Sequence, residues 1–195
     1  MLIPSFAPNP RSCDPDAGRT TVFLPPAGFR EVESVEAARF LSREPAAFAS
    51  TDRNSPRPAL RAGVKFERKV HDELTASWNQ FGSYLAGPWI EFKSGNRTRV
   101  CQPDALLLFK SGAVLIVEVK LTHTANAWWQ LRKLYEPVVK ALTNHSHPVY
   151  VVEICKSGDP LISFPEKVKM HSQGSLEDVK AFWTNEFNLV IMKKV

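Results

Sequence analysis

The stretch CQPDALLLFKSGAVLIVEVK, residues 101–120, contains two apolar runs of the kind that form buried strands. An acid, Asp104, stands at the start of the first run, and the second run contains Glu118 and Lys120. Charged side chains are rarely buried unless they are paired or bind a ligand. Because side chains alternate along a strand, Glu118 and Lys120 point to the same face. Asp104 lies on the neighbouring strand across a short hairpin, so we expect the three to converge at one edge of a sheet.

Two carboxylates and one lysine leave this cluster with a net negative charge among apolar residues. Such a cluster raises its own pKa values and lowers stability, and a divalent cation would offset both effects. Oxygen ligands of this kind suit Mg²⁺ or Mn²⁺. The alternative is a structural pair of Glu118 with Lys120, and an aspartate that caps a turn.

A long amphipathic helix is predicted upstream, because apolar residues between Leu60 and Phe81 recur at helical spacing until Gly82. At about 100° per residue, Glu67 falls inside the apolar stripe rather than opposite it. Glu67 is therefore predicted to be a third carboxylate on the core side. The alternative is an acid near the helix end that reaches solvent. Glu73 lies near the edge of the stripe and is the weaker candidate.

The other elements are predicted from apolar alternation, turn residues and helix caps. Together they indicate an α/β fold in which helices flank a mixed central sheet. Strands are expected at 89–93, 99–109, 113–121, 149–154 and 187–192, with helices at 124–142, kinked at Pro137, and at 175–183.

The first 58 residues are predicted to form a proline-rich arm, because nine of the fifteen prolines lie there. One short helix is expected within it, at 34–42. The arm either packs onto the core or mediates contact with a partner, including a second copy of the chain. Residues 59–195 are predicted to form the main domain.

The composition excludes several classes of protein. The chain has 195 residues, of which 44% are hydrophobic, so a sizeable core is expected and a disordered chain is not. Its three cysteines, too widely spaced for a disulfide framework, indicate a reduced cytoplasmic protein. Neither a signal peptide nor a membrane-spanning run is recognisable. The net charge of +5 is compatible with a polyanionic partner.

Glu67, Pro103-Asp104 and Glu118-Val119-Lys120 together resemble the motif of the PD-(D/E)XK nuclease superfamily. The predicted order of elements over 59–154 is similar to the αβββαβ core of that restriction-endonuclease-like fold. The resemblance implies a Mg²⁺- or Mn²⁺-dependent nuclease that hydrolyses DNA in recombination, repair or processing, as either an exonuclease or an endonuclease. A small single-domain nuclease of this kind is typical of a phage or mobile element, acting in the cytoplasm of a bacterial or phage-infected cell.

The resemblance also implies a role for each motif residue. Asp104, Glu118 and the backbone carbonyl of Val119 would hold the metal, and Glu67 would bind it directly or through water. Lys120 would orient or deprotonate the attacking water, since desolvation beside a metal lowers the pKa of a lysine. The alternative is a catalytically silent nucleic-acid-binding or assembly module. An intact, energetically unfavourable charge cluster argues against that alternative.

The RecB-like and lambda-exonuclease-like branches carry a QxxxY pattern on the helix after the EVK strand. Here Gln130 and Tyr135 are one residue further apart than that pattern requires. On a regular α-helix they would lie about 140° apart and could not share a face. Gln130 is therefore predicted to line the site, and Tyr135 to belong to the core. The iron–sulfur variants of this branch need four cysteines, and this chain has three.

Several other residues are candidate nucleic-acid contacts. Lys93, Arg97 and Arg99 flank the first predicted hairpin, where they would contact phosphates or form a solvated surface. Trp129 is a candidate for stacking on bases, because its neighbour Trp128 lies on the predicted core face. His123, three residues after the EVK motif, either touches the site or is structural, and a lone histidine is more often structural.

Overall fold

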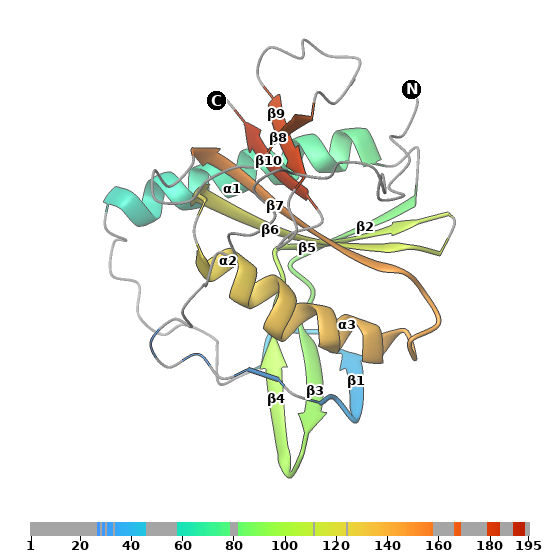
Figure 1. Ribbon diagram of the computed structural model, residues 1–195. Helices are drawn as coiled ribbons and strands as arrows, with labels where there is room; N and C mark the ends of the chain where they lie inside the picture. Colours follow the sequence, from blue (N-terminus) through green and yellow to red (C-terminus); the bar gives the residue numbers. More distant parts are fainter. Residues whose placement is uncertain are drawn as a thin grey trace.

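The computed structural model describes residues 27, 29, 31–32, 34–45, 58–78, 82–110, 112–123, 125–157, 166–168, 179–183 and 189–193. These residues form three layers, with a sheet between two helical layers (Figure 1). One layer is α1 (Pro58–Trp78). The other is a helical segment made of α2 (Ala125–Gln130), η1 (Leu131–Tyr135) and α3 (Glu136–Leu142). The predicted α/β class is therefore confirmed.

Seven of the described strands form the large sheet, in the order β2-β5-β6-β7-β10-β9-β8. The pairs β6·β7 and β7·β10 are parallel, and the other neighbours are antiparallel, so the sheet is mixed as predicted. Its strands are β2 (Gly82–Ala86), β5 (Ala105–Phe109), β6 (Val114–Thr122), β7 (Val149–Ser157), β8 (Glu166–Val168), β9 (Val179–Trp183) and β10 (Leu189–Lys193).

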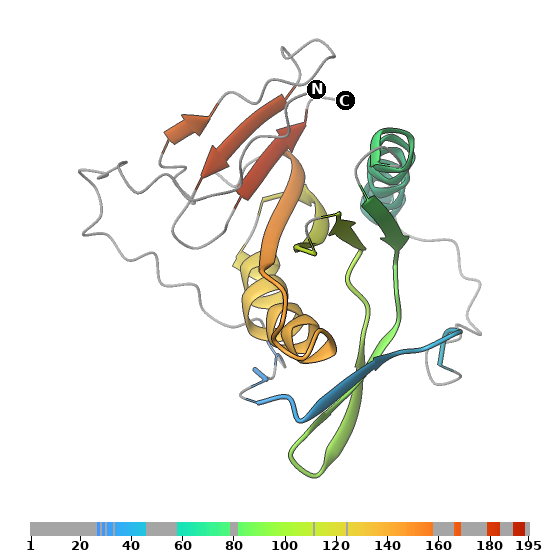
Figure 2. The same ribbon diagram turned by 90° about the vertical axis from the view of Figure 1, so that its right-hand side faces the viewer.

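A second, antiparallel sheet has the order β1-β3-β4. It combines β1 (Ala37–Phe40) with the hairpin of β3 (Ile90–Ser94) and β4 (Arg97–Cys101). Gly95 in the hairpin turn has a φ of +56°, a conformation that glycine adopts without steric cost. Figures 1 and 2 both show the hairpin extending away from the large sheet, on the side opposite α1.

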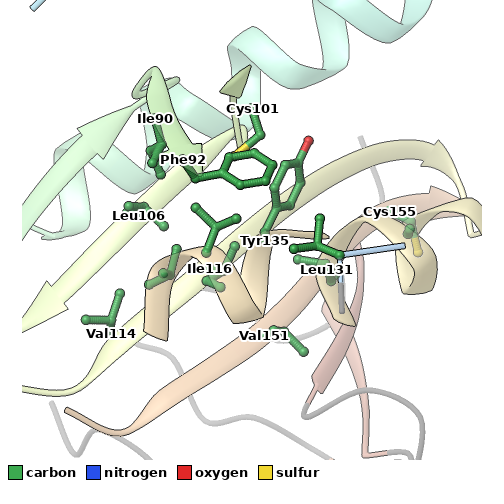
Figure 3. Close-up of a cluster of buried hydrophobic side chains, with 14 residues drawn as sticks. Ile90, Phe92, Cys101, Leu106, Val114, Ile116, Leu131, Tyr135, Val151 and Cys155 are labelled. Carbon is green, nitrogen blue, oxygen red and sulfur yellow. The ribbon is translucent and has the colours of Figure 1, made fainter. Parts of the chain in front are cut away.

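Two clusters of buried apolar side chains, among those described, join the layers. The cluster on the α1 face consists of Phe66, Val70, Ala105, Leu107, Leu115, Val117, Val119, Val152 and Ile154. Strand residues of the opposite parity pack against the other helical segment and the small sheet (Figure 3). This second cluster includes Ile90, Phe92, Leu106, Val114, Ile116, Leu131, Tyr135, Val138 and Val151.

The helical segment is continuous from Ala125 to Leu142 but contains a π-helical turn at Leu131–Tyr135. The turn is closed by the Glu136 N–H, which donates to the carbonyl of Leu131 five residues earlier. Pro137 follows at once, and a proline cannot donate to the carbonyl four residues before it. That carbonyl, of Lys133, accepts the Val32 N–H at 3.1 Å instead.

Close backbone packing explains one glycine of the large sheet. A Cβ atom at Gly82 would lie 1.7 Å from the carbonyl oxygen of Leu108. β2 and β5 therefore pair at this point only if residue 82 has no side chain.

Most of the predicted elements are confirmed. The helix predicted to end near Gly82 is α1, and the strands predicted at 89–93, 113–121, 149–154 and 187–192 are β3, β6, β7 and β10. The helix predicted at 124–142 is α2–η1–α3. Thr124, residues 175–178 and most of the predicted arm lie outside the described residues.

Four predictions were wrong or incomplete. The helix predicted at 34–42 is the strand β1, because pairing with β3 outweighs the helical spacing of its apolar residues. The helix predicted at 175–183 contains the strand β9, which pairs with β10. The strand predicted at 99–109 is β4 and β5 in different sheets, separated at Pro103, which has no N–H for a ladder. β2 and β8 were not predicted.

Among the described residues, no helix has the length and apolarity needed to cross a membrane.

Candidate functional site

Three acidic residues lie side by side across adjacent strands of the large sheet. The register pairs Glu118 of β6 with Glu153 of β7. Ala105 of β5 pairs with Val117, so one further step of the same antiparallel register puts Asp104 beside Glu118. Neighbouring strands are about 4.8 Å apart, so the acids form a continuous row. We call Asp104, Glu118 and Glu153 the acidic row.

Asp104 is fixed directly to the next strand. Its Oδ2 accepts the backbone N–H of Val119 at 2.6 Å, and its backbone carbonyl accepts the N–H of Gly87 at 2.8 Å. Burial raises the pKa of Asp104, and the nearby Glu67 carboxylate raises it further, against the opposing effects of the Val119 N–H, Lys120 and His71. The structure therefore brings together Asp104 and Glu118-Val119-Lys120, as predicted.

Glu118 is the most deeply buried member of the predicted set, with 1% of its surface exposed. Its Oε1 accepts a hydrogen bond from Lys120, whereas no described group hydrogen-bonds to Oε2. Burial, followed by the charge of Asp104, raises the pKa of Glu118 to about 8. A buried acceptor that lacks a hydrogen-bond donor is energetically unfavourable, and a cation bound at Oε2 would remove that penalty.

The pKa of Lys120 is set by its pairing with Glu118. Burial by itself lowers the pKa of Lys120, but the charge of Glu118 and their hydrogen bond raise it more, so the net direction is upward. The predicted role of Lys120 as a base assumes a neighbouring metal ion, so it stays a prediction. A lysine that keeps its proton suits the orientation of water and the stabilisation of negative charge.

Glu67 approaches the row from α1, on the other side of the sheet from η1. It is close enough for its charge to raise the pKa values of Asp104 and Tyr84. Its Oε1 lies 3.6 Å from Nε2 of His71, and Nδ1 of His71 contacts the Tyr84 hydroxyl. With 42% of its side chain exposed, Glu67 reaches both the site and solvent. It therefore has features of both alternatives, the carboxylate on the core side and the acid that reaches solvent.

The π-helical turn alters the predicted relation of Gln130 to Tyr135. The extra residue is absorbed between them, so they share a face, and the Gln130 side chain hydrogen-bonds to the Tyr135 hydroxyl. That hydroxyl also donates to the carbonyl of Gln102 at 3.1 Å. The prediction that the two could not share a face was wrong, because it assumed a regular α-helix.

Tyr135 is a core residue, as predicted, but its hydroxyl belongs to the site. Its ring is buried in the cluster that Figure 3 shows. Burial, then the charges of Glu118 and Asp104, raise its pKa well above the ordinary tyrosine value. The side chain therefore links the core to the acidic row.

The candidate nucleic-acid contacts lie on the periphery of this arrangement. Arg97 is exposed at the tip of the hairpin, and Lys93 forms an ion pair of 2.9 Å with Glu36. The guanidinium carbon of Arg99 lies 5.8 Å from the centroid of the Phe92 ring.

Trp129, the candidate for base stacking, is partly buried among aromatic rings. It packs edge-on against Phe29 and Trp128, with ring centroids 5.4 and 5.2 Å away. These contacts hold the ring within the protein, although part of its surface is accessible.

Sequence reasoning missed Glu153 and His71. Glu153 stands inside the apolar run VYVVEIC and is fully buried, so it carries the same signal that identified Glu118. His71 lies one helical turn after Glu67 and therefore shares its face.

A further buried group, which shares Glu153 with the acidic row, can hold a metal ion. It consists of His123, Glu153 and Cys155, whose ligand atoms all lie within 4.8 Å of one another. His123, for which a structural role was the more common alternative, pairs with Glu153 through Nδ1. Asp104, Glu118 and Glu67 offer carboxylate oxygens, the ligand type that a hard divalent cation prefers, but among the described residues their ligand atoms do not gather as closely as those of this group.

No protein-family model matches this chain, and no curated protein or solved structure matches it significantly.

Proposed function

We propose that this chain is a Mg²⁺-dependent deoxyribonuclease of the PD-(D/E)XK type. The observation that carries the proposal is the arrangement of Asp104, Glu118 and Lys120. Asp104 accepts a hydrogen bond from the backbone N–H of Val119. Glu118 presents a buried oxygen to which no described group donates a hydrogen bond. Lys120 lies beside that carboxylate with a raised pKa.

The order of elements supports the proposal. With the β3–β4 hairpin set aside, α1, β2, β5, β6, the α2–η1–α3 segment and β7 occur in the order α, β, β, β, α and β, with β6 and β7 parallel. This order is the one expected of a PD-(D/E)XK core and so supports the proposal, with β2 as the first strand in place of the predicted 89–93. The β3–β4 hairpin is then an insertion between the first two core strands.

The residues would divide the work as follows. Asp104, Glu118 and the carbonyl of Val119 would hold Mg²⁺, with Glu67 at the exposed side. Bound there, the ion would provide hydroxide at neutral pH and charge stabilisation at the phosphate. Lys120 would donate hydrogen bonds to the water or to the phosphate oxygens.

The Gln130–Tyr135 pair would form the wall of the site opposite Glu67. Gln130 keeps an amide group beside the Tyr135 hydroxyl, where it can donate to a phosphate or a base. The burial of Tyr135 fixes the position of that pair.

A cleavage assay tests the proposal. Supercoiled, linear, single-stranded and branched DNA would be incubated with the full chain in Mg²⁺, Mn²⁺ or EDTA. We expect metal-dependent cleavage that Lys120→Ala abolishes. Lys110→Ala is the matched control, because Lys110 is an exposed lysine in the β5–β6 turn and should leave cleavage unchanged.

A different outcome would favour a catalytically silent module. In that case no DNA would be cut under any metal condition, and Lys120→Ala would bind DNA as tightly as the natural chain. Cleavage that persists in EDTA, or in Lys120→Ala, would contradict the assignment of the site.

A further inference from the structure

Three side chains of different chemistry meet inside the protein at the end of β6. Glu153 and Cys155 are separated by one residue on β7, so they point to the same face, and His123 follows directly after β6. Their exposed fractions are 0% for Glu153, 0% for Cys155 and 2% for His123. Figure 3 shows Cys155 at the end of the apolar cluster, beyond Leu131.

A hydrophobic core does not require this group. Packing alone would be served by apolar side chains at all three positions, and a buried carboxylate is unfavourable unless its charge is compensated. The pair of His123 with Glu153 offers part of that compensation. Glu153 also lies next to Glu118 in the register, so ionisation of both side chains at once is unfavourable. A bound dication would compensate their charges.

The ligand types select the ion. An imidazole nitrogen, a carboxylate oxygen and a sulfur form a mixed set that suits Zn²⁺, whereas Mg²⁺ prefers oxygen ligands only. Zinc is bound in proteins by three or four such groups at tetrahedral positions. On the Asp104 side of Glu118, carboxylate oxygens are offered to a hard ion. On the Glu153 side, His123, Glu153 and Cys155 offer a mixed set of ligands to a softer ion.

We propose that His123, Glu153 and Cys155 bind a Zn²⁺ ion, at a site separate from the one formed by Asp104 and Glu118. The inference does not depend on nuclease activity.

The geometry requires only a small adjustment. Ligand atoms of a tetrahedral zinc site lie about 3.4 Å apart, given metal–ligand bonds of about 2.0 to 2.3 Å. Here they lie within 4.8 Å of one another, so rotamer changes on the order of 1 Å would close the site. Three protein ligands leave a fourth position for water or another group.

Cobalt provides a direct test, because Co²⁺ occupies zinc sites and reports thiolate ligands by charge-transfer absorption in the near ultraviolet. The full chain would be freed of metal with a chelator and titrated with Co²⁺, then with Zn²⁺. We expect a saturable charge-transfer band at one Co²⁺ per chain that Zn²⁺ removes. Cys155→Ser should abolish the band.

Matched variants separate this site from other sources of the signal. Cys101→Ser removes a second buried cysteine, outside the group, and should retain the band. Glu153→Gln removes a proposed ligand, so it should weaken Co²⁺ binding by at least the about tenfold loss that is typical when a group that only supports a ligand is changed. Asp104→Asn should retain the band while losing DNA cleavage, so the two proposals can fail independently.

Two results would overturn the inference. One is a natural chain that shows no thiolate band at saturating Co²⁺, a result that needs no variant and therefore no assumption about variant folding. The other is a Cys155→Ser chain, folded by circular dichroism, whose band is unchanged.

Discussion

Replacing Glu118 with glutamine removes one ionisable group from the acidic row while nearly preserving its shape. Burial raises the pKa of Glu118 from 4.5 to about 8 in the folded chain. The folded state therefore binds this proton more tightly than the unfolded state. The contribution of this proton to the free energy of unfolding is fully present below about pH 4.5 and is lost as the pH rises through about 8.

The magnitude follows from the interval between the two pKa values. Each pH unit within it costs about 1.4 kcal/mol of unfolding free energy. Between about pH 5.5 and about pH 7, the natural chain should therefore lose about 2 kcal/mol that Glu118→Gln keeps. The variant also removes the carboxylate whose charge and hydrogen bond raise the pKa of Lys120 against burial. Burial alone lowers the pKa of a lysine, and a lowered lysine pKa likewise favours the variant as the pH rises.

Urea unfolding of both chains in EDTA, at several pH values across this interval, measures the difference in unfolding free energy. We expect that difference to move steadily in favour of Glu118→Gln as the pH rises. A difference that does not change with pH would refute the argument that burial holds the proton on Glu118.

The same two chains test the metal site. Ligand binding to the folded state stabilises it by about 2.7 kcal/mol at a concentration one hundred times the Kd. Mg²⁺ should therefore raise the melting temperature of the natural chain at about pH 8, and raise that of Glu118→Gln much less. Equal responses of the two chains would exclude Glu118 as a ligand.

Three further changes have defined expectations. Tyr135→Phe removes a hydroxyl with two hydrogen bonds, and should cost about 1 to 3 kcal/mol in urea unfolding and slow DNA cleavage; unchanged values for both would contradict its role. Deletion of Lys133 shortens the π-helical turn by one residue and should leave a regular helix with Gln130 still facing Tyr135. Retained cleavage with equal or higher stability would support this, whereas loss of folding would refute it. Gly82→Ala should lower the free energy of unfolding by more than about 2 kcal/mol, because its Cβ would overlap the backbone of Leu108. A melting temperature equal to that of the natural chain would contradict the close approach of β2 to β5.

Much of the site was predictable because side chains alternate between the two faces of a strand. Glu118 and Lys120 are two residues apart inside an apolar run, so their shared face could be inferred without a structure. Asp104 could be added because a short turn joins its strand to the next. Glu67 required only the angular position of residues on a regular helix. Each of these inferences depends on local geometry that the residues themselves dictate.

The remaining features depend on contacts between distant segments. β1 has the apolar spacing of a helix and becomes a strand because β3 offers a ladder of hydrogen bonds. Beside the π-helical turn, the carbonyl of Lys133, to which Pro137 cannot donate, accepts the N–H of Val32 from a distant part of the sequence. Glu153 could have been found by the reasoning applied to Glu118, but its place in the row depends on the parallel pairing of β6 with β7.

The segment that connects β2 to β5 contains the β3–β4 hairpin, and two hydrogen bonds join its two ends. The Gly87 N–H donates to the carbonyl of Asp104, and Nε2 of Gln102 donates to the carbonyl of Gly87, both at 2.8 Å. Because β2 and β5 pair directly, the strand order of the large sheet does not depend on what lies between these bonds. The hairpin is in this sense an insertion into the large sheet, and Ile90 and Phe92 anchor it by packing in the core cluster. Since these bonds end at Asp104, the hairpin is connected to the large sheet directly beside the acidic row, so the base of the hairpin and the candidate site share one stretch of backbone.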